Sequence, residues 1–210
     1  MKIALDVFGG DFAPTSNIEG AMSYLDGNDD AANLILIGDQ NMITSALQSF
    51  TYNKSKVEIL HTTQVVDMNE KPSRIFRVKA DSSLVKSIYL VKDGKANAAV
   101  SAGNTGALLA TSQFLIGKIP GINRPAFAPF IPSNKGGFIL CDAGANADSK
   151  PQHLIQFALM ACAYMKHLEK RSNPRVALLN IGREEGKGNE LTTTTYPLLN
   201  KLLPNFIGNI

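Results

Sequence analysis

Short apolar runs alternate with longer amphipathic stretches along the whole chain. The short runs predict buried β-strands, and the stretches whose apolar residues recur three or four positions apart predict helices. The predicted strands cover residues 3–5, 34–37, 57–60, 98–100, 138–140 and 176–179, and an apolar strand pattern returns at 206–210. The predicted helices cover residues 17–25, 42–50, 83–92, 105–116, 151–171 and 191–203.

This alternation predicts an α/β fold. Strand, helix and strand in repeated order are typical of a mostly parallel sheet with helices on both faces. We expect one α/β domain over residues 1–210, with an irregular or hairpin-like insertion at 123–137, which holds three Pro and two Gly. The chain ends in an apolar strand pattern without a polar tail, which favours a polypeptide cut short at its C-terminus.

The composition is that of an ordinary globular chain. Hydrophobic residues make up 44% and charged residues 19%, which excludes a disordered protein. The net charge of +3 is too small and too scattered to indicate nucleic-acid binding. Cys141 and Cys162 lack metal-ligand spacing and predict reduced, buried thiols. No signal peptide and no membrane-spanning run is expected, so we predict a cytoplasmic protein.

Two glycine-containing segments follow predicted strands, at the ends where open α/β sheets bind ligands. In the first, Gly9 and Gly10 permit a tight turn between Asp6 and Asp11, with a plain strand-to-helix turn as the alternative. The second is Ser101–Gly106, where small residues before a helix leave backbone N–H donors uncovered for a phosphate or an oxyanion. The alternative is simple capping of that helix by Asn or Thr.

Two more segments lie between a predicted strand and a predicted helix. One contains Asp142 and Asn146, which could orient a ligand or cap the next helix. The other, residues 180–190, combines charge with three glycines in seven residues, which disfavours a plain helix. A mobile loop that delivers Lys187 or Arg183 to an anion is the sharper hypothesis, and a solvated charged surface is the alternative.

A basic stretch precedes the predicted helix at 83–92. Arg77 and Lys79 could face solvent, or they could attract a phosphate or an acidic carrier. Asp81 or Ser82 could cap the helix that follows. The three His residues have no metal-ligand or Ser-His spacing, so neither a metal site nor a cofactor is expected.

In their order along the chain, these segments resemble the bacterial phosphate acyltransferases of phospholipid synthesis (the PlsX type). The stretches 101–107, 150–158 and 188–192 are the most similar, and the resemblance covers all 210 positions. It corresponds to about two-thirds of a usual family member, without the C-terminal third. Departures are Phe8, where Met is usual, Arg183, where a small polar residue is usual, and Gly186, where an aliphatic residue is usual.

The resemblance implies the isocitrate/isopropylmalate dehydrogenase-like fold that phosphate acetyltransferases share. It also implies a reaction in which the thioester of an acyl carrier protein and inorganic phosphate give acyl-phosphate and free carrier. A homodimer is expected, with peripheral contact to the inner face of the membrane through the absent C-terminal part.

Phosphate is already an anionic nucleophile, so this reaction requires no Ser or Cys intermediate and no ATP. We assign phosphate binding to Ser101–Gly106 and Lys187, with the side chains of Asn104 and Thr105 as donors and Asp142 ordering the pocket; Arg77 and Lys79 would meet the phosphopantetheine arm or the carrier. The residues expected to bind substrate are Asp6, Gly9, Gly10, Asp11, Arg77, Lys79, Ser82, Ser83, Ser101, Gly103, Gly106, Gly144, Asn146, Asn180, Gly182, Glu185, Asn189 and Glu190.

Three alternatives remain open at this point. A phosphate acetyl- or butyryltransferase would use acyl-coenzyme A in place of the carrier protein. An NAD-linked decarboxylating dehydrogenase of similar fold lacks support, because no dinucleotide fingerprint is present. A chain without its last third could also be a non-catalytic fragment that binds the carrier.

Overall fold

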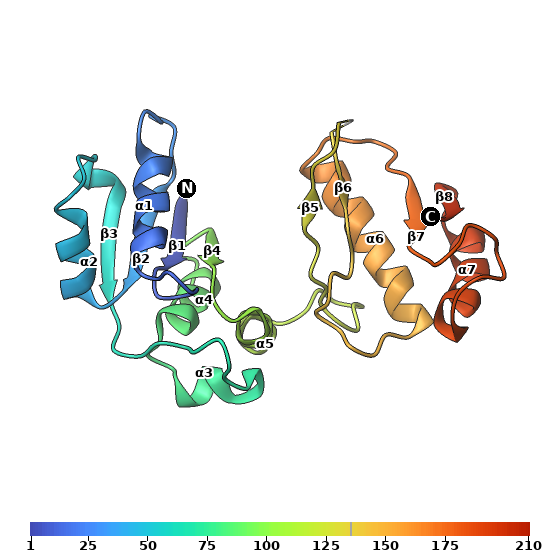
Figure 1. The fold of residues 1–210 in the computed structure, drawn as a ribbon, viewed down its shortest axis with the longest axis horizontal. Helices are drawn as coiled ribbons and strands as arrows, with labels where there is room; N and C mark the ends of the chain where they lie inside the picture. The colour runs from blue at the N-terminus through green and yellow to red at the C-terminus, as the bar shows by residue number, and fades with distance from the viewer. Residues whose placement is uncertain (135) are drawn as a thin grey trace. The chain divides into compact units, whose positions relative to one another are not determined.

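The computed structural model describes residues 1–134 and 136–210, and the chain divides into two compact units, Met1–Gly117 and Lys118–Ile210 (Figure 1). Each unit has a hydrophobic core of its own. The expectation of a single α/β domain over the whole chain stays a prediction. No helix in the described part of the chain is long and apolar enough to cross a membrane.

The first unit is built on a four-stranded sheet in the order β3-β2-β1-β4. All three strand pairs are parallel, so the carboxyl ends of the strands lie at one edge. Asp6 at the end of the inner strand β1 is paired with Ile37 on one side and Ser101 on the other. The strands are β1 (Lys2–Asp6), β2 (Asn33–Gly38), β3 (Val57–His61) and β4 (Ala98–Ser101).

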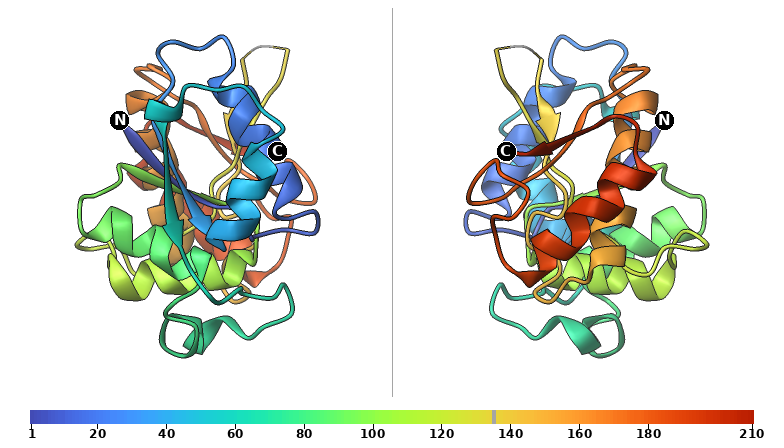
Figure 2. Two further views of the ribbon diagram at one scale, coloured as in Figure 1. Left: turned by 90° about the vertical axis from the view of Figure 1, so that its left-hand side faces the viewer. Right: turned by 90° about the vertical axis from the view of Figure 1, so that its right-hand side faces the viewer.

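Helices cover both faces of this sheet (Figure 2, left). On one face, α1 (Thr15–Leu25) and α2 (Gln40–Leu47) pack against one set of alternating side chains of β2, which includes Leu36. On the other face, α4 (Ser83–Lys92) packs against the opposite set, which includes Ile35. Because successive strand residues point to opposite faces, a continuous apolar run in β2 is what a sheet buried on both sides requires.

Short helices complete the first unit at the carboxyl edge of the sheet. There the 3-10 turn η2 (Pro72–Arg74) leads directly into α3 (Ile75–Val78), whereas a second 3-10 turn, η1 (Lys54–Lys56), precedes β3 and lies at the opposite, amino edge. The helix α5 (Thr105–Leu115) packs with α3 and α4 around a small core that contains Ala107. The elements η2, α3 and α5 lie next to the loops that emerge from β1 and β4.

The second unit contains two pairs of strands. The first is an antiparallel pair, β5 (Phe130–Ile131) and β6 (Phe138–Ile139), within and just after the segment expected to be irregular or hairpin-like. The second is a parallel pair, β7 (Val176–Leu178) and β8 (Phe206–Asn209). The core of the second unit includes Leu178 and Leu199, and the helices described in this unit are α6 (Pro151–His167) and α7 (Glu190–Leu202).

The structure confirms the α/β class and the mostly parallel strand pairing that the hydrophobic pattern predicts. The helix predicted to reach Arg171 is shorter, because it ends at His167. Lys170 there adopts a left-handed backbone with φ of +55°, and the N–H of Arg171 turns back to the carbonyl of Met165, 3.1 Å away. The short elements η2 and α3 have no counterpart among the predicted helices.

Candidate active site

The loops that follow β1 and β4 are joined through a buried carboxylate. Asp6 is 2% exposed, and its Oδ2 accepts a hydrogen bond of 2.7 Å from the hydroxyl of Ser101. The other oxygen, Oδ1, accepts from the N–H of Phe8 at 3.2 Å. The Ser101 hydroxyl in turn accepts from the N–H of Gly103 at 3.1 Å. One acidic side chain therefore fixes both loops at the carboxyl edge of the sheet.

Backbone meets backbone where these two loops touch. A Cβ atom added to Gly9 would lie 2.7 Å from Asp6 Oδ2 and 2.7 Å from the backbone nitrogen of Gly103. A Cβ atom on Gly103 would lie 3.0 Å from the Cα atom of Gly9. The distances at Gly9 are shorter than real Cβ contacts and the one at Gly103 is unusually tight, so the approach of the two loops requires glycine at Gly9 and favours it at Gly103.

The first loop is held from behind by an asparagine that the sequence did not single out. Asn17 of α1 donates through Nδ2 to the carbonyls of Val7 and Gly9, at 3.0 and 2.7 Å. Gly10 has a φ of +104°, which only glycine adopts without strain, and Asp11 beyond it is exposed. A polar residue on a helix carries no sequence signal for such a role, which is why it was missed.

Asn104 begins α5 and has its side chain fully engaged. Its Oδ1 accepts from the N–H of Ala107 at 2.9 Å, which makes it the N-cap residue of α5. Its Nδ2 donates to the carbonyls of Asp67, Met68 and Glu70, at 3.2, 3.0 and 3.0 Å. The residue as a whole is 7% exposed. In this structure Asn104 fastens the 67–70 loop to α5 and has no donor left for a ligand.

The backbone donors of the first turn of α5 are free. The N–H groups of Thr105 and Gly106 have no hydrogen-bond partner among the residues that the structure describes. The first N–H groups of a helix lack intrahelical partners and carry partial positive charge, so they attract anions. A Cβ atom on Gly106 would lie 2.7 Å from Cγ of Pro72, so the start of α5 lies directly against η2.

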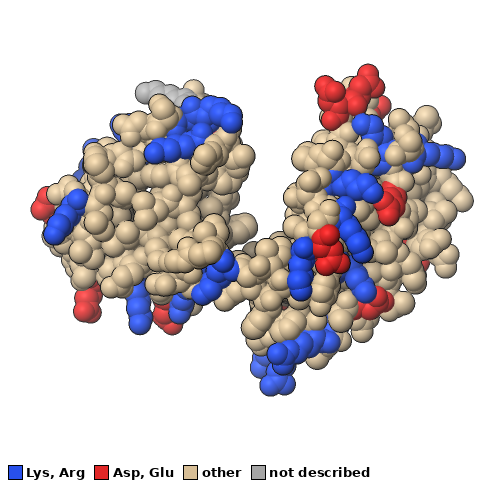
Figure 3. All heavy atoms as spheres, turned by 180° about the vertical axis from the view of Figure 1, so that it is seen from behind, with Lys and Arg blue, Asp and Glu red and all other residues tan. Residues whose placement is uncertain are grey.

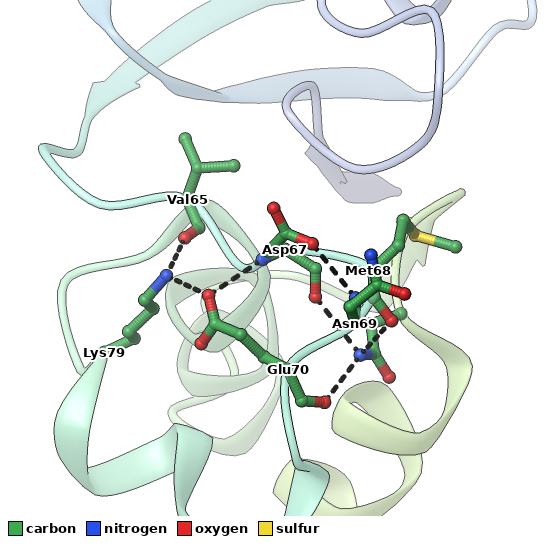
Figure 4. Close-up of polar contacts among 7 residues, drawn as sticks. Val65, Asp67, Met68, Asn69, Glu70 and Lys79 are labelled. Atoms are coloured by element: carbon green, nitrogen blue, oxygen red, sulfur yellow. Dashed lines mark hydrogen bonds and ion pairs between the residues drawn. The ribbon is translucent and has the colours of Figure 1, made fainter.

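Lys79, expected to meet the carrier, forms an ion pair with Glu70 instead (Figure 4). Its ammonium also donates to the carbonyl of Val65 at 2.5 Å, and Glu70 accepts from the N–H of Asp67 at 3.1 Å. The hydrogen bond from Lys79 holds the pKa of the Glu70 carboxyl below its ordinary value. A Glu nine positions before a Lys in a loop gives no local sequence signal.

The other predicted residues of the basic stretch fall into two groups. Arg77 is exposed, and its guanidinium carbon lies 5.1 Å from the ring centre of Phe76. Ser82 is buried and caps α4 by accepting from the N–H of Val85 at 3.3 Å, and Ser83 is buried in the first turn of that helix. Arg77 therefore remains available to a ligand or a partner, whereas the two serines support α4.

In the second unit, Asp142 is saturated with N–H donors. It accepts from Phe127 N at 2.7 Å, Ala145 N at 3.3 Å, Asn146 N at 2.8 Å and Asn146 Nδ2 at 3.1 Å. Asn146 also donates to the carbonyl of Pro125 at 3.0 Å. Gly144 at the tip of this turn is exposed and has a φ of +102°. Asp142 and Asn146 thus order their own loop.

Burial, together with the adjacent charge of Asp142, raises the pKa of the Cys141 thiol to about 11. A thiol with so high a pKa stays protonated at neutral pH and is a poor nucleophile. Cys141 and Cys162 are both free thiols.

The glycine-rich loop after β7 is folded back on itself. Asn180 donates through Nδ2 to the carbonyl of Lys187 at 2.8 Å, and Asn189 caps α7 by accepting from the N–H of Thr192 at 3.0 Å. The ammonium of Lys187 is exposed and pairs with no acidic residue in the described part of the chain. The remaining predicted residues of this loop are Gly182, which is partly buried, and Glu185 and Glu190, which are exposed.

Within the first unit, the structure brings together Asp6, Gly9, Ser101, Gly103 and the free N–H groups at the start of α5. Within the second unit, it joins the Asn180 side chain to the backbone carbonyl of Lys187. That the two sets share one phosphate pocket stays a prediction. No group of three or more potential metal ligands occurs in residues 1–134 and 136–210.

A family described as fatty acid synthesis proteins matches residues 1–210 of this chain. The phosphate acyltransferase of Clostridium kluyveri is 46% identical over 210 residues, which are all of this chain and 62% of that relative. The phosphate acyltransferase of Halothermothrix orenii is 47% identical over 212 residues, 63% of its length. The chain therefore spans less than two-thirds of the length of these curated relatives.

Two solved structures share the fold. The EutD phosphotransacetylase from Staphylococcus aureus has a TM-score of 0.66 and 18% sequence identity, over 99% of this chain and 67% of that one. A branched-chain phosphotransacylase from Enterococcus faecalis has a TM-score of 0.60 and 12% identity, over 100% of this chain and 66% of that one. At such identities the likeness extends to the fold alone, and it confirms the phosphate acetyltransferase-like fold expected from the sequence.

Proposed function

The chain belongs to the family of fatty acid synthesis proteins, and from that premise we propose that it is a phosphate acyltransferase that makes acyl-phosphate from an acyl thioester and inorganic phosphate. We assign the donor to an acyl carrier protein and the product to phospholipid synthesis. The curated relatives named phosphate acyltransferase support the transfer to phosphate. The homodimer and the peripheral membrane contact belong to the same proposal.

One observation carries the phosphate site: two unpaired backbone N–H groups, of Thr105 and Gly106, at the start of α5. They lie next to the glycine contact between the β1 and β4 loops, whose geometry is set by the Asp6–Ser101 hydrogen bond. A phosphate anion suits a helix N-terminus lined by small residues. Since the donors are fixed by the backbone, they need no reorganisation when the anion binds.

In the reaction, a phosphate oxygen attacks the thioester carbonyl carbon and forms a tetrahedral oxyanion. The carbon–sulfur bond then breaks, the thiolate leaves and takes up a proton, and the acyl group remains on phosphate. The Thr105 and Gly106 N–H groups hold the phosphate, and Asn104 keeps that turn in position through its cap. Holding two reactants together in the correct orientation can lower the barrier by about 7–11 kcal/mol at most.

Thr105→Pro tests this site because it deletes the backbone N–H group together with the threonine side chain while keeping a residue that suits the start of a helix. Proline is favoured at the first position of a helix, and Asn104 before it already has the extended backbone, with φ of −62° and ψ of 105°, that a residue preceding proline prefers. A hydrogen bond to a charged group is worth about 1.5–3 kcal/mol, so we expect the KM for phosphate to rise roughly 10- to 100-fold. Thr105→Ala, which keeps the N–H group, is the matched control.

The outcome is read as acyl-phosphate formation, trapped as a hydroxamate, with phosphate varied. An unchanged KM and kcat in Thr105→Pro would remove the start of α5 from the site. A large loss in Thr105→Ala as well would show that the hydroxyl, as expected from the sequence, is the donor that matters.

The alternative donor is acyl-coenzyme A, which keeps the same acceptor and the same phosphate site. We retain this alternative because the two solved structures of similar fold are a phosphotransacetylase and a branched-chain phosphotransacylase. Acyl-carrier and acyl-coenzyme A substrates with the same chain, compared side by side for kcat/KM, separate the two. We expect the carrier substrate to be preferred, and a preference for coenzyme A would replace the donor assignment without touching the phosphate site.

A further inference from the structure

A cationic strip runs along η2 and α3. Residues 71–79 contain Lys71, Arg74, Arg77 and Lys79 and no acidic residue. Glu70 neutralises Lys79, but the other three are exposed and form no ion pair with any residue that the structure describes. Lys71 and Arg74 flank and end the 3-10 turn η2, and Arg77 lies in the following helix α3, so the three cations recur at every third position of one short segment.

The strip lies at one end of the first unit. Figure 1 places α3 at the lower end of that unit, and Figure 3, seen from behind, shows Lys and Arg side chains gathered at the same end. Three like charges held together without partners cost folding energy through their mutual repulsion. A function in binding an anionic partner explains why they are kept together.

Exposed apolar side chains accompany the strip. The ring of Phe76 stacks on that of Phe114, with centroids 4.5 Å apart, and Arg77 lies over Phe76. Phe114 is 60% exposed and Val78 is 62% exposed. Aromatic and Arg side chains with an apolar centre are enriched at protein–protein interfaces. The composition is that of a protein-binding surface, whereas nucleotides bind in concave sites.

The strip is rigidly connected to the candidate phosphate site. Pro72 of η2 packs against Gly106 at the start of α5, and Asn104 is hydrogen-bonded to the carbonyls of the loop that precedes η2. A protein bound on the strip would therefore lie beside the free N–H groups of α5. The strip and the candidate phosphate site therefore belong to the same unit.

We propose that Lys71, Arg74 and Arg77, with the apolar side chains beside them, form the docking surface for the acyl carrier protein, recognised as an acidic protein helix. The inference rests on the proposed function, because that function supplies the carrier as acyl donor. The positive strip steers the acidic partner and sets its orientation, and the Phe76–Phe114 pair supplies the apolar contact at its centre.

The test is the triple charge reversal Lys71→Glu, Arg74→Glu, Arg77→Glu in the 210-residue chain. The matched control, Lys54→Glu, Lys92→Glu, Lys95→Glu, has the same net charge change but lies before β3 and before β4, at the amino edge of the sheet. Affinity for an acylated, acidic carrier protein is measured by titration calorimetry at low and at high salt. The KM for that carrier and the phosphate KM are measured in parallel.

We expect the strip variant to bind the carrier at least tenfold more weakly at low salt and to lose most of the salt dependence of binding. The control should stay within about twofold of the native chain. In the strip variant, acyl-coenzyme A turnover should fall far less than turnover of the carrier substrate, because coenzyme A brings no protein to dock. The phosphate KM should be unchanged in both variants, since neither substitutes a residue of the phosphate site.

Unchanged carrier affinity in the strip variant overturns the proposal. An equal loss with acyl-coenzyme A overturns it too, because the strip would then bind the phosphates of a nucleotide. Loss of binding to vesicles with anionic lipids, with carrier affinity intact, would assign the strip to the membrane. If no donor yields acyl-phosphate but carrier binding still depends on the strip, the proposed reaction fails while the docking surface stands.

Discussion

Gly9→Ala perturbs the contact that shapes the candidate phosphate site. The added methyl group would lie 2.7 Å from the Asp6 carboxylate and 2.7 Å from the backbone nitrogen of Gly103. The Gly103 atom in contact is a backbone nitrogen, which cannot rotate away as a side chain could, and the Asp6 carboxylate is held by its hydrogen bond from Ser101. The two loops must therefore separate, which stretches the contacts on both sides of the methyl group.

The magnitude follows from these contacts. Inserting a methyl group into a packed site costs about 1–3 kcal/mol, and weakening a hydrogen bond to a buried carboxylate costs about 1.5–3 kcal/mol if it is lost entirely. Because part of the strain is relieved when the bond lengthens, we expect Gly9→Ala to lower the free energy of unfolding by about 2–4 kcal/mol. The phosphate KM should rise with it, since Gly103 carries the turn that leads into α5.

Gly20→Ala is the matched control for this measurement. Gly20 lies inside α1, and a Cβ atom there would meet nothing within 4 Å. Alanine in an exposed helix should raise the free energy of unfolding by about 0.5–1 kcal/mol. Urea unfolding of both variants should thus give shifts of opposite sign. If Gly9→Ala were as stable as the native chain, the β1 and β4 loops would not be in contact and the site as described would be refuted.

Three further changes probe the supports of the site. Asn104→Asp keeps the cap acceptor but sets a carboxylate against three carbonyls, so amide hydrogen exchange in residues 67–70 should speed up while α5 stays protected. Glu70→Gln should reduce the loss of stability to urea that occurs below pH 4.5. The hydrogen bond from Lys79 lowers the pKa of the Glu70 carboxyl in the folded chain. The stability that this carboxyl contributes is therefore complete above the ordinary pKa of 4.5 and is lost as the pH falls. Asp142→Asn replaces one of two oxygens, each of which accepts two hydrogen bonds, by an amide nitrogen that cannot accept, and urea unfolding should show a loss of about 1–3 kcal/mol.

The parallel sheet could be predicted because its signal is local. Most strands of the first unit are short apolar runs bounded by polar or glycine residues, and the inner strand β2 is buried on both faces. The segment η2–α3 could not be predicted in the same way. It is short and rich in basic residues, and its only deeply buried apolar residue is Ile75, so it has no helical repeat to detect.

The candidate site was predictable in its location but not in its internal contacts. Strand ends in an open sheet locate the segments that contain Asp6 and Ser101, and register then makes these two residues neighbours. The sequence also suggested Asn104 and Lys79 as ligand donors. The Asn104 side chain instead donates to the carbonyls of the 67–70 loop, far earlier in the chain. The Lys79 side chain pairs with Glu70, nine positions before it. Contacts of this kind depend on tertiary packing, which no window of a single sequence contains.

Both units use conspicuous polar side chains to hold loops, and the free donors at the candidate phosphate site of the first unit are backbone N–H groups. Asp6 is the last residue of β1 and Asp142 lies shortly after β6, and the oxygens of both accept hydrogen bonds from N–H groups or a hydroxyl nearby. The side-chain amide of Asn104 likewise bonds to nearby backbone groups, at the carbonyl of Met68 and the N–H of Ala107. The donors that remain free at the start of α5 belong to main-chain atoms of Thr105 and Gly106. A site made from main-chain donors requires small residues and fixed turns rather than particular catalytic side chains. That requirement explains why its sequence is glycine-rich, and why it contains no triad or metal-ligand motif by which a catalytic centre is usually found.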